Sequence, residues 1–373
     1  MPFAMNAPLQ SVANPALETP LTAHLRVPAA ACVDYQGSLT ARVFSTLDQE
    51  LAALTTAAGL YDLGYKAYLK ITGNDRIRWT NGMVTNTIQG LPDGHWNSSF
   101  LLNAQGRIQG DANIYRTAEA LLLQTSCAQI AHLSAHLDHF IIMDDVELQP
   151  LDASQTTIGI AGPDSPQILS ELGLSIPDEG AFTRTSLNGI GLTLVHAYSP
   201  VVPRFELWLP ETALPDLWAT LQRKGAIPCG VAALEALRIL EATPLYGVDI
   251  QERHLAQETG QTRMLNFNKG CYLGQEIVER IRSRATVHRN LRQFSVENTP
   301  ESLEPGRTIE INAESAERNP VGDLTSLAHY ALPSFTGALA LGIVRTEALE
   351  RKLRLTHSGG SVTVLETPPP VNQ

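Results

Sequence analysis

The chain has 373 residues, of which 43% are hydrophobic and 17% are charged, and its formal net charge is −11 at pH 7. A chain of this length can bury a large core and divide into about two or three domains. The negative net charge argues against a protein that coats nucleic acid or an anionic membrane. The N-terminal stretch lacks the pattern of a secretory signal and no apolar run is long enough to cross a bilayer, so we expect a cytoplasmic protein.

The apolar pattern predicts alternating strands and helices. Residues 67–73 alternate as a strand does, and residues 74–88 have helical periodicity, with Asn74 or Asp75 available as the N-cap. The next predicted elements, in chain order, are a β-meander (98–126), a helix (128–142), a strand (146–152), a strand (156–161), a helix (165–172), strands (191–197 and 205–209) and helices (214–223 and 230–242). After about residue 290, short alternating segments between turn residues predict a small antiparallel barrel. The order is two mixed α+β units followed by an all-β module.

The spacing of cysteines and histidines does not predict a metal site. The four cysteines lie far apart, with no CxxC pair, which is typical of a reduced chain rather than a disulfide or zinc framework. His132, His136 and His139 share one helical face, but the leucines between them belong to a core stripe and no HExxH glutamate accompanies them. We therefore expect no tightly bound metal.

The segment "KGCYLGQE", residues 269–276, is the first candidate site. Cys271 lies between Gly270 and Gly274 where a helix begins, and a helix N-terminus with Lys269 nearby favours a thiolate. Glu276 in the first turn opposes that effect. From these residues alone, Cys271 is either a reactive thiol or a small apolar residue in a turn.

A basic stretch follows directly. "RIRSRATVHRNLR", residues 280–292, has five arginines and no acidic residue in an otherwise acidic chain. It is either an ordinary solvated face or a site for an anionic ligand or acidic partner. Nucleotide hydrolysis and serine catalysis have no support, because neither a GxxxxGK[ST] loop nor a GxSxG elbow is present.

Several segments together resemble a known family. "FNKGCYLGQEIVER" is similar to the K-G-C-[FY]-x-G-Q-E signature of the YgfZ family, folate-binding proteins that support iron–sulfur enzymes and are related to the glycine cleavage T-protein. Other segments resemble the wider aminomethyltransferase superfamily and occur in the expected order: 69–88, 101–108, 160–169, 204–210, 237–250 and 322–345.

The resemblance implies an α+β, three-domain aminomethyltransferase fold of the T-protein and YgfZ type, with a C-terminal antiparallel β-barrel. Its expected domains are a discontinuous folate-binding domain 1 (25–65 and 152–285), an inserted domain 2 (66–151), the barrel (286–365) and flexible termini (1–24 and 366–373).

The resemblance also implies a folate site. Glu206 matches a glutamate that accepts hydrogen bonds from the pterin ring, whose aminopyrimidinone edge offers two adjacent N–H donors to a carboxylate. Arg238 and Tyr246 match positions near the folate. The alternative for both residues is a structural role, with Arg238 as a partner of Glu241 on its own helix.

Domain 2 contributes a further candidate. T-proteins have two consecutive aspartates, the first of which assists one-carbon transfer; here the pair is Gly110-Asp111. Asp111 is therefore expected to face the pocket, while the loss of the first carboxylate puts transfer in the T-protein manner in doubt.

The signature implies that Cys271 is a working thiol. Lys269 would stabilise its thiolate, and Gln275 and Glu276 would fix the loop by capping hydrogen bonds. The basic stretch would hold the glutamyl tail of the folate or an acidic partner.

The expected function is that of a tetrahydrofolate-binding protein that supports assembly or repair of iron–sulfur enzymes, such as tRNA methylthiotransferases, through Cys271. Its ligand is tetrahydrofolate or a one-carbon derivative, its partners are iron–sulfur enzymes or assembly proteins, and contact with nucleic acid is indirect, through a tRNA-modifying partner. The alternative is a folate-dependent aminomethyltransferase or demethylase that acts on a small methylated amine. Asp111 favours this alternative and Gly110 disfavours it.

Overall fold

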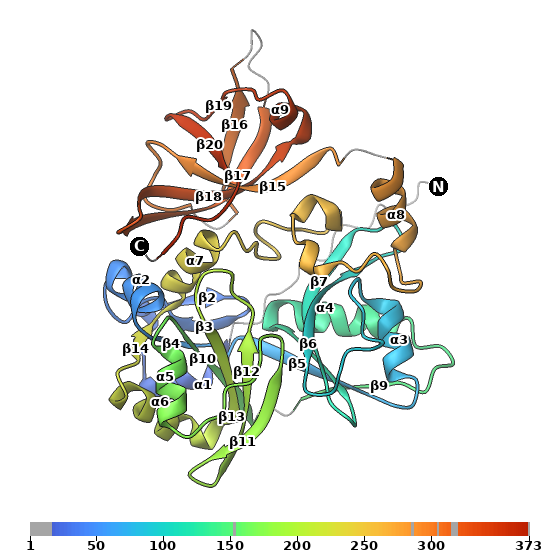
Figure 1. Cartoon of the computed structure of the whole chain (residues 1–373), viewed down its shortest axis with the longest axis vertical. Coiled ribbons are helices and arrows are strands. Elements are labelled where there is room, and N and C mark those ends of the chain that lie inside the picture. Colours follow the sequence, from blue (N-terminus) through green and yellow to red (C-terminus); the bar gives the residue numbers. More distant parts are fainter. Residues whose placement is uncertain (1–16, 152–153, 285–286, 304–305, 315–319, 372–373) are drawn as a thin grey trace, which may run out of the picture.

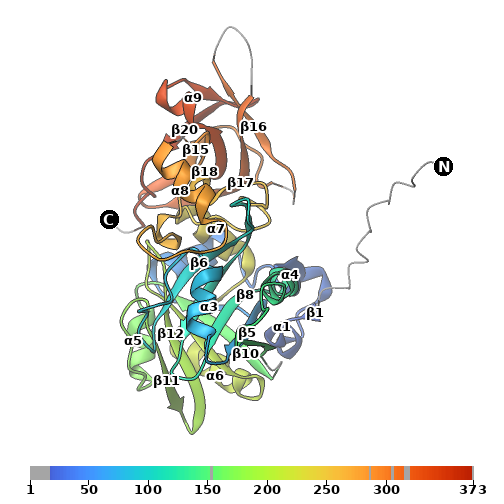
Figure 2. The same cartoon turned by 90° about the vertical axis from the view of Figure 1, so that its right-hand side faces the viewer.

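The computed structural model describes residues 17–151, 154–284, 287–303, 306–314 and 320–371 (Figure 1). A closed barrel lies at the top of Figure 1, a six-stranded sheet at the lower left and a five-stranded sheet at the lower right. The turned view keeps the barrel at the same end of the molecule, above both sheets (Figure 2). The predicted α+β class with a C-terminal antiparallel barrel is confirmed.

The six-stranded sheet has the order β11-β12-β13-β10-β4-β14. Its strands are β4 (Gly59–Asp62), β10 (Gln155–Ala161), β11 (Phe182–Leu187), β12 (Ile190–Ala197), β13 (Arg204–Pro210) and β14 (Ile227–Cys229). Helices α5 (Ser165–Glu171) and α6 (Leu214–Arg223) share one apolar core with this sheet. In α6 the buried residues follow helical spacing: Leu214, Leu217, Trp218 and Leu221. This regular stripe explains why the predicted bounds of α6 agree with the structure.

The five-stranded sheet has the order β6-β7-β8-β5-β9. Its strands are β5 (Lys66–Thr72), β6 (Trp96–Leu102), β7 (Ile108–Arg116), β8 (Leu121–Ser126) and β9 (Glu147–Pro150), packed with α3 (Arg76–Met83) and α4 (Cys127–Asp138). The predicted meander is confirmed as β6, β7 and β8. The predicted helices are longer than the observed ones. Helix α3 ends where Val84 adopts extended backbone, and α4 ends at Asp138 rather than at residue 142.

A small three-stranded sheet and several helical segments lie beside these parts. The sheet has the order β1-β3-β2, with strands β1 (Leu17–Glu18), β2 (Cys32–Tyr35) and β3 (Ser38–Ala41). Nearby are α1 (Pro20–Leu25), η1 (Ala29–Ala31), α2 (Leu47–Thr56) and α7 (Val231–Leu240). Helices α2 and α7 share a core with the barrel, and Tyr330 Oη donates to the carbonyl of Ala236 at 2.6 Å. Helix α7 therefore fastens the barrel to the rest of the chain.

The barrel closes in the order β15-β18-β17-β16-β19-β20, with all neighbours antiparallel. Its strands are β15 (Arg289–Val296), β16 (Ile309–Ala313), β17 (Pro320–Leu332), β18 (Phe335–Arg345), β19 (Leu355–Thr356) and β20 (Ser361–Leu365). The remaining helical segments are η2 (Glu211–Ala213), η3 (Ala256–Thr259), η4 (Thr262–Met264), α8 (Gln275–Arg284) and α9 (Thr346–Glu350). Within the described ranges, no helix is long and apolar enough to cross a membrane.

Part of the prediction for the termini is wrong. The range 1–24 was expected to be flexible, yet Thr19 is 1% exposed at the start of α1 and its hydroxyl donates to the Asp62 carboxylate. At the other end, Val371 is 5% exposed in the core that α7 shares with the barrel. Each of the two ranges expected to be flexible therefore contains a buried side chain. Residues 1–16 and 372–373 lie outside the described residues.

The division into domains stays a prediction. The strands of the five-stranded sheet fall within the predicted insertion, 66–151, and those of the six-stranded sheet come from both sides of it. Two of the expected boundaries, at residues 152 and 285, lie outside the described residues.

Candidate functional site

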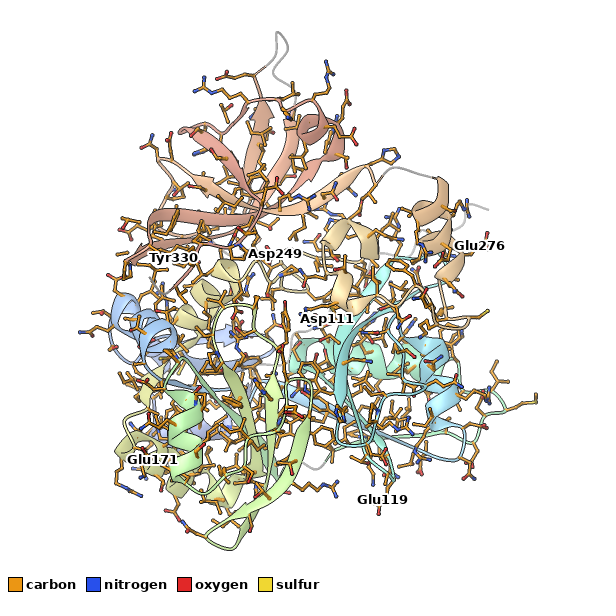
Figure 3. All side chains as sticks on the ribbon, in the orientation of Figure 1. Asp111, Glu119, Glu171, Asp249, Glu276 and Tyr330 are labelled. Carbon is orange, nitrogen blue, oxygen red and sulfur yellow. The ribbon has the colours of Figure 1, made fainter. Side chains whose placement is uncertain are left out.

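A cavity of about 250 Å³ lies between the two large sheets and helix α7. Its walls come from β5, β6, β7 and β8, from β13, and from the segment 243–264 that follows α7. Figure 3 places Asp111 near the middle of the molecule, where these parts meet. Segments that are distant in sequence therefore present their side chains to one shared space.

Glu206 is the buried carboxylate of this cavity. It lies on β13, is 3% exposed, and forms an ion pair through Oε1 with Lys66 on β5. Its other oxygen accepts hydrogen bonds from Gln124 Nε2 at 2.8 Å and from Trp208 Nε1 at 3.1 Å. Three donors thus hold the carboxylate from two different sheets.

The surroundings of Glu206 keep it ionised. Burial alone would raise the pKa of Glu206, but the charge of Lys66 and the hydrogen bonds from Lys66, Gln124 and Trp208 outweigh burial and lower the pKa below its ordinary value. The carboxylate is therefore a charged acceptor in the cavity wall.

Asp111 on β7 also lines the cavity. Its Oδ1 accepts from Gln129 Nε2 at 2.9 Å, and its own N–H donates to Gln129 Oε1 at 3.1 Å. Burial raises the pKa of Asp111, although the Gln129 hydrogen bond and the charges of Arg263 and Lys66 act in the opposite direction. Asp111 is thus a carboxylate that holds its proton more readily than usual.

Gly110 explains the missing first aspartate of the pair. A Cβ at this position would lie 2.7 Å from Gln129 Oε1 and 2.8 Å from Leu133 Cδ2. A side chain fits there only if the Gln129 and Leu133 side chains move. The Gln129 side chain that holds Asp111 therefore occupies the space that a side chain at position 110 would need.

Arg238 lines the cavity, as the resemblance implies. It does not pair with Glu241, the partner expected if its role were structural. Its guanidinium forms ion pairs with Glu235 at 2.5 Å and Asp249 at 2.8 Å, and it donates to Ser326 Oγ at 2.9 Å. Glu241 instead pairs with Arg204 at 3.0 Å. Arg238 thus joins α7 to β17 of the barrel.

Tyr246 lies beside the cavity. It packs with Tyr272 and Ile250 in one apolar cluster, and burial, followed by the charges of Glu252 and Asp111, raises the pKa of Tyr246 to about 12. The cavity wall next to it is formed by Leu245 and Ile250. Tyr246 therefore supports the wall from behind as a neutral phenol.

Lys269 has a different role from the one expected beside the thiol. Its ammonium donates to the carbonyls of Asn81 (2.6 Å), Val84 (2.6 Å) and Asn86 (2.7 Å), at and after the end of α3. These three bonds use all its N–H donors, so Lys269 caps α3 instead of supporting Cys271. Burial lowers the pKa of Lys269 to about 7.

Cys271 is exposed and lies in the loop before α8, apart from the described residues that line the cavity. Gln275 Oε1 accepts from the N–H of Tyr272 at 3.3 Å, a capping contact of the expected kind. Glu276 does not cap the loop; its carboxylate faces Arg280 at 3.4 Å, and Figure 3 shows it at the periphery. The thiol thus faces solvent rather than the cavity.

The histidine face of α4 makes ordinary contacts. His136 Nε2 lies 3.2 Å from the carbonyl of Leu102, and burial lowers the pKa of His136. Among the described residues, no group of three or more His, Cys, Asp or Glu side chains is arranged to hold a metal ion. In the basic stretch, Arg282 stacks on Phe267, while residues 285–286 lie outside the described residues.

Sequence reasoning missed several residues of the site. Lys66, Gln124 and Trp208 surround Glu206, and Arg263 lines the same cavity. The weak signal in the sequence was the position of Lys66 directly before the predicted strand 67–73. The partners are 140 and 82 residues from Glu206 for Lys66 and Gln124, so only the fold brings them together.

The sequence matches the GCVT N-terminal domain family over residues 27–269, which is more than half of the chain. The chain belongs to this family. The matched region contains Glu206, Asp111, Lys66 and the other cavity residues described above. The cavity is therefore a property of the GCVT region rather than of the barrel.

Similar proteins extend this result. A chloroplastic candidate transferase of Arabidopsis thaliana is 25% identical over 327 residues, covering 87% of this chain and 72% of that protein. An aminomethyltransferase of Geobacillus sp. (strain WCH70) is 25% identical over 281 residues, covering 73% of this chain and 77% of that protein.

The fold is that of a solved aminomethyltransferase. The crystal structure of glycine cleavage system aminomethyltransferase T from Bartonella henselae aligns with a TM-score of 0.82 at 18% identity, covering 95% of this chain and 98% of that chain. The aminomethyltransferase fold expected from the resemblance is confirmed.

Proposed function

We propose that this GCVT-family protein binds tetrahydrofolate, or a one-carbon derivative of it, in the central cavity and acts as an aminomethyltransferase. The observation that carries the proposal is the ionised Glu206 carboxylate in the wall of a cavity inside an aminomethyltransferase fold. The names of its relatives support the same class of activity. This ranks the transferase alternative above the iron–sulfur role.

The cavity residues fit a pterin ring on one condition. A carboxylate has about four acceptor positions, and Glu206 already uses three of them for Lys66, Gln124 and Trp208. The paired N–H donors of a pterin need two. One of the three donors must therefore turn away when the ring binds, and we expect it to be Lys66, whose side chain is flexible and 19% exposed. Tyr65 and Trp96 in the cavity wall offer aromatic surface to the ring.

Asp111 supplies the second part of the chemistry. In a transfer of the aminomethyl type, the donor carbon loses its bonds to an amine and to a leaving atom and gains bonds to N5 and N10 of the folate. The two folate N–H protons pass to the amine and the leaving atom, so no oxidant is needed. A carboxylate with a raised pKa suits the movement of one of these protons.

The test measures binding of tetrahydrofolate by the shift that it causes in the thermal unfolding temperature. Tetrahydrofolate should raise the Tm of the wild type and of Glu211→Gln, a control at the start of η2, directly after β13. Glu206→Gln should bind about 10 to 100 times more weakly, because it loses a charge-assisted pair of hydrogen bonds. The absence of a Tm shift in the wild type, or an equal shift in Glu206→Gln, would remove the proposal.

The exposed thiol favours a second candidate. The KGCYLGQE segment resembles the YgfZ signature, and Cys271 faces solvent, where a partner protein can reach it. On this reading the protein supports the assembly or repair of iron–sulfur enzymes, such as a tRNA methylthiotransferase, with folate bound in the cavity.

Complementation separates the two candidates. In cells that lack this protein, tRNA methylthiolation should be restored by the wild type and by Cys32→Ala but not by Cys271→Ala, if the iron–sulfur role is correct. Restoration by Cys271→Ala would exclude a chemical role of this thiol. Failure of the wild type itself would leave the transferase as the remaining candidate.

A further inference from the structure

The cations of the cavity differ in their partners. Four basic side chains line it, and three of them are ion-paired: Lys66 with Glu206, Arg204 with Glu241, and Arg238 with Glu235 and Asp249. Arg263 has no carboxylate within ion-pair distance among the described residues, and its Nε has no hydrogen-bond partner there. A guanidinium removed from water without an anion is unfavourable. Among the described residues that line the cavity, Arg263 is thus the one cation without a carboxylate partner.

Arg263 is held in a fixed orientation. Its guanidinium carbon lies 4.1 Å from the ring centroid of Tyr198, and its Nη1 donates to Ser98 Oγ at 2.9 Å. Ser98 Oγ in turn donates to Asn113 Oδ1 at 2.7 Å. A stacked and hydrogen-bonded guanidinium loses little conformational freedom on binding, which favours planar anions such as carboxylates.

Asp111 supplies the opposite charge in the same cavity. The charge of Arg263 acts to lower the pKa of Asp111, yet the two side chains do not form an ion pair within 4.0 Å. Only Oδ1 of Asp111 has a side-chain hydrogen-bond partner among the described residues, and that partner is Gln129. Among the described residues, a cation and a carboxylate that both lack an ion-pair partner thus line the same cavity, and together they complement a ligand that has both charges.

We propose that Arg263 binds the carboxylate of a small amino acid and that Asp111 faces the amine of the same molecule. The inference deepens the proposed function and rests on it: the amino acid is the amine whose nitrogen carries the transferred carbon. Glu206 and Lys66 serve the pterin side of the cavity, and Arg263 with Asp111 serves the donor side.

Calorimetric titration of the full chain with glycine, acetate and methylamine tests the assignment. The wild type should bind glycine more tightly than either fragment. Arg263→Gln should bind glycine and acetate at least about 10-fold more weakly, since a charged hydrogen-bonded pair is lost, and should bind methylamine as the wild type does. Asp111→Asn should weaken glycine and methylamine and leave acetate unchanged, which provides a second test if Arg263→Gln does not fold.

The controls separate this inference from the proposed function. Arg253→Gln, an exposed arginine of the same segment, should match the wild type in every titration. Equal glycine binding in Arg263→Gln and the wild type, or none in the wild type, would overturn the inference. The inference would also be overturned if Arg263→Gln lost binding only of tetrahydrofolate and bound tetrahydropterin as tightly as the wild type does. Arg263 would then hold the folate tail. Arg263-dependent glycine binding without tetrahydrofolate binding would overturn the proposed function and retain the amino-acid site.

Discussion

Lys66 on β5 and Glu206 on β13 form a buried ion pair that joins the five-stranded sheet to the six-stranded sheet. The side chain of Lys66 is 19% exposed and that of Glu206 is 4% exposed. The same carboxylate is the acceptor proposed for the pterin ring. Lys66 therefore keeps Glu206 charged without ligand and competes with the ligand for it.

Lys66→Met should bind tetrahydrofolate about 10-fold more tightly, because the ligand no longer has to displace an ammonium group. Without ligand, the variant should lose about 3 kcal/mol of stability, since a buried carboxylate is left without its cation. Titration calorimetry and chemical denaturation measure both effects, with Lys70→Met on the same strand as control. Weaker binding by Lys66→Met would mean that the ammonium group takes part in holding the ligand.

Lys269→Met should lower the free energy of unfolding by about 2 to 4 kcal/mol. The substitution leaves the carbonyls of Asn81, Val84 and Asn86 without their shared donor, at the end of α3. Cys271→Ala, two residues away and exposed, should stay within about 0.5 kcal/mol of the wild type. Chemical denaturation of both variants checks this, and equal stability of the two would argue against the capping role of Lys269.

Folding stability should fall as pH decreases from about 6.5 to about 4. Burial, followed by the charges of Arg253, Arg289 and Arg107, lowers the pKa of His254 from 6.5 to about 4. His254 Nδ1 also accepts from the Gln251 N–H at 2.9 Å, which requires an unprotonated nitrogen. Between these pH values the unfolded chain binds more protons than the folded one. Titration of His254 therefore lowers the free energy of unfolding by up to about 3 kcal/mol.

Denaturation of the wild type and of His254→Gln at several pH values between 7.5 and 4.5 isolates this effect. The stability advantage of the wild type should shrink as the pH falls, because glutamine does not titrate. Parallel stability curves for the two proteins would show that His254 is not the responsible group.

Elements with a long regular pattern could be predicted from the sequence. Helix α6 was predicted at its observed bounds, because its apolar stripe has helical spacing. Strand β4 was missed: its four residues are all buried and show no alternation, and its partners β10 and β14 are distant in sequence. Short central strands depend on pairing that local periodicity does not contain.

The sequence predicted individual residues of the site, but not the contacts between residues that are distant in sequence. Glu206 and Asp111 were expected in the pocket from the resemblance, and both line the cavity. Lys269 was assigned to the thiol because it is near Cys271 in the sequence, whereas its ammonium reaches carbonyls 183 to 188 residues away. That Arg263 has no ion-paired carboxylate in the described part of the chain depends on the fold, because other basic side chains pair with Glu206, Glu235, Glu241 and Asp249.

The most direct test of aminomethyl transfer is run in reverse, with methylenetetrahydrofolate, ammonium chloride and dithiothreitol. Carbon–nitrogen and carbon–sulfur bonds form as tetrahydrofolate is released, with no change of oxidation state. We predict that the wild type accelerates release above the uncatalysed rate, and that Asp111→Asn is at least about 100-fold slower, because a proton-transferring carboxylate is lost. Release at the uncatalysed rate with wild type, or equal rates for wild type and Asp111→Asn, would contradict it.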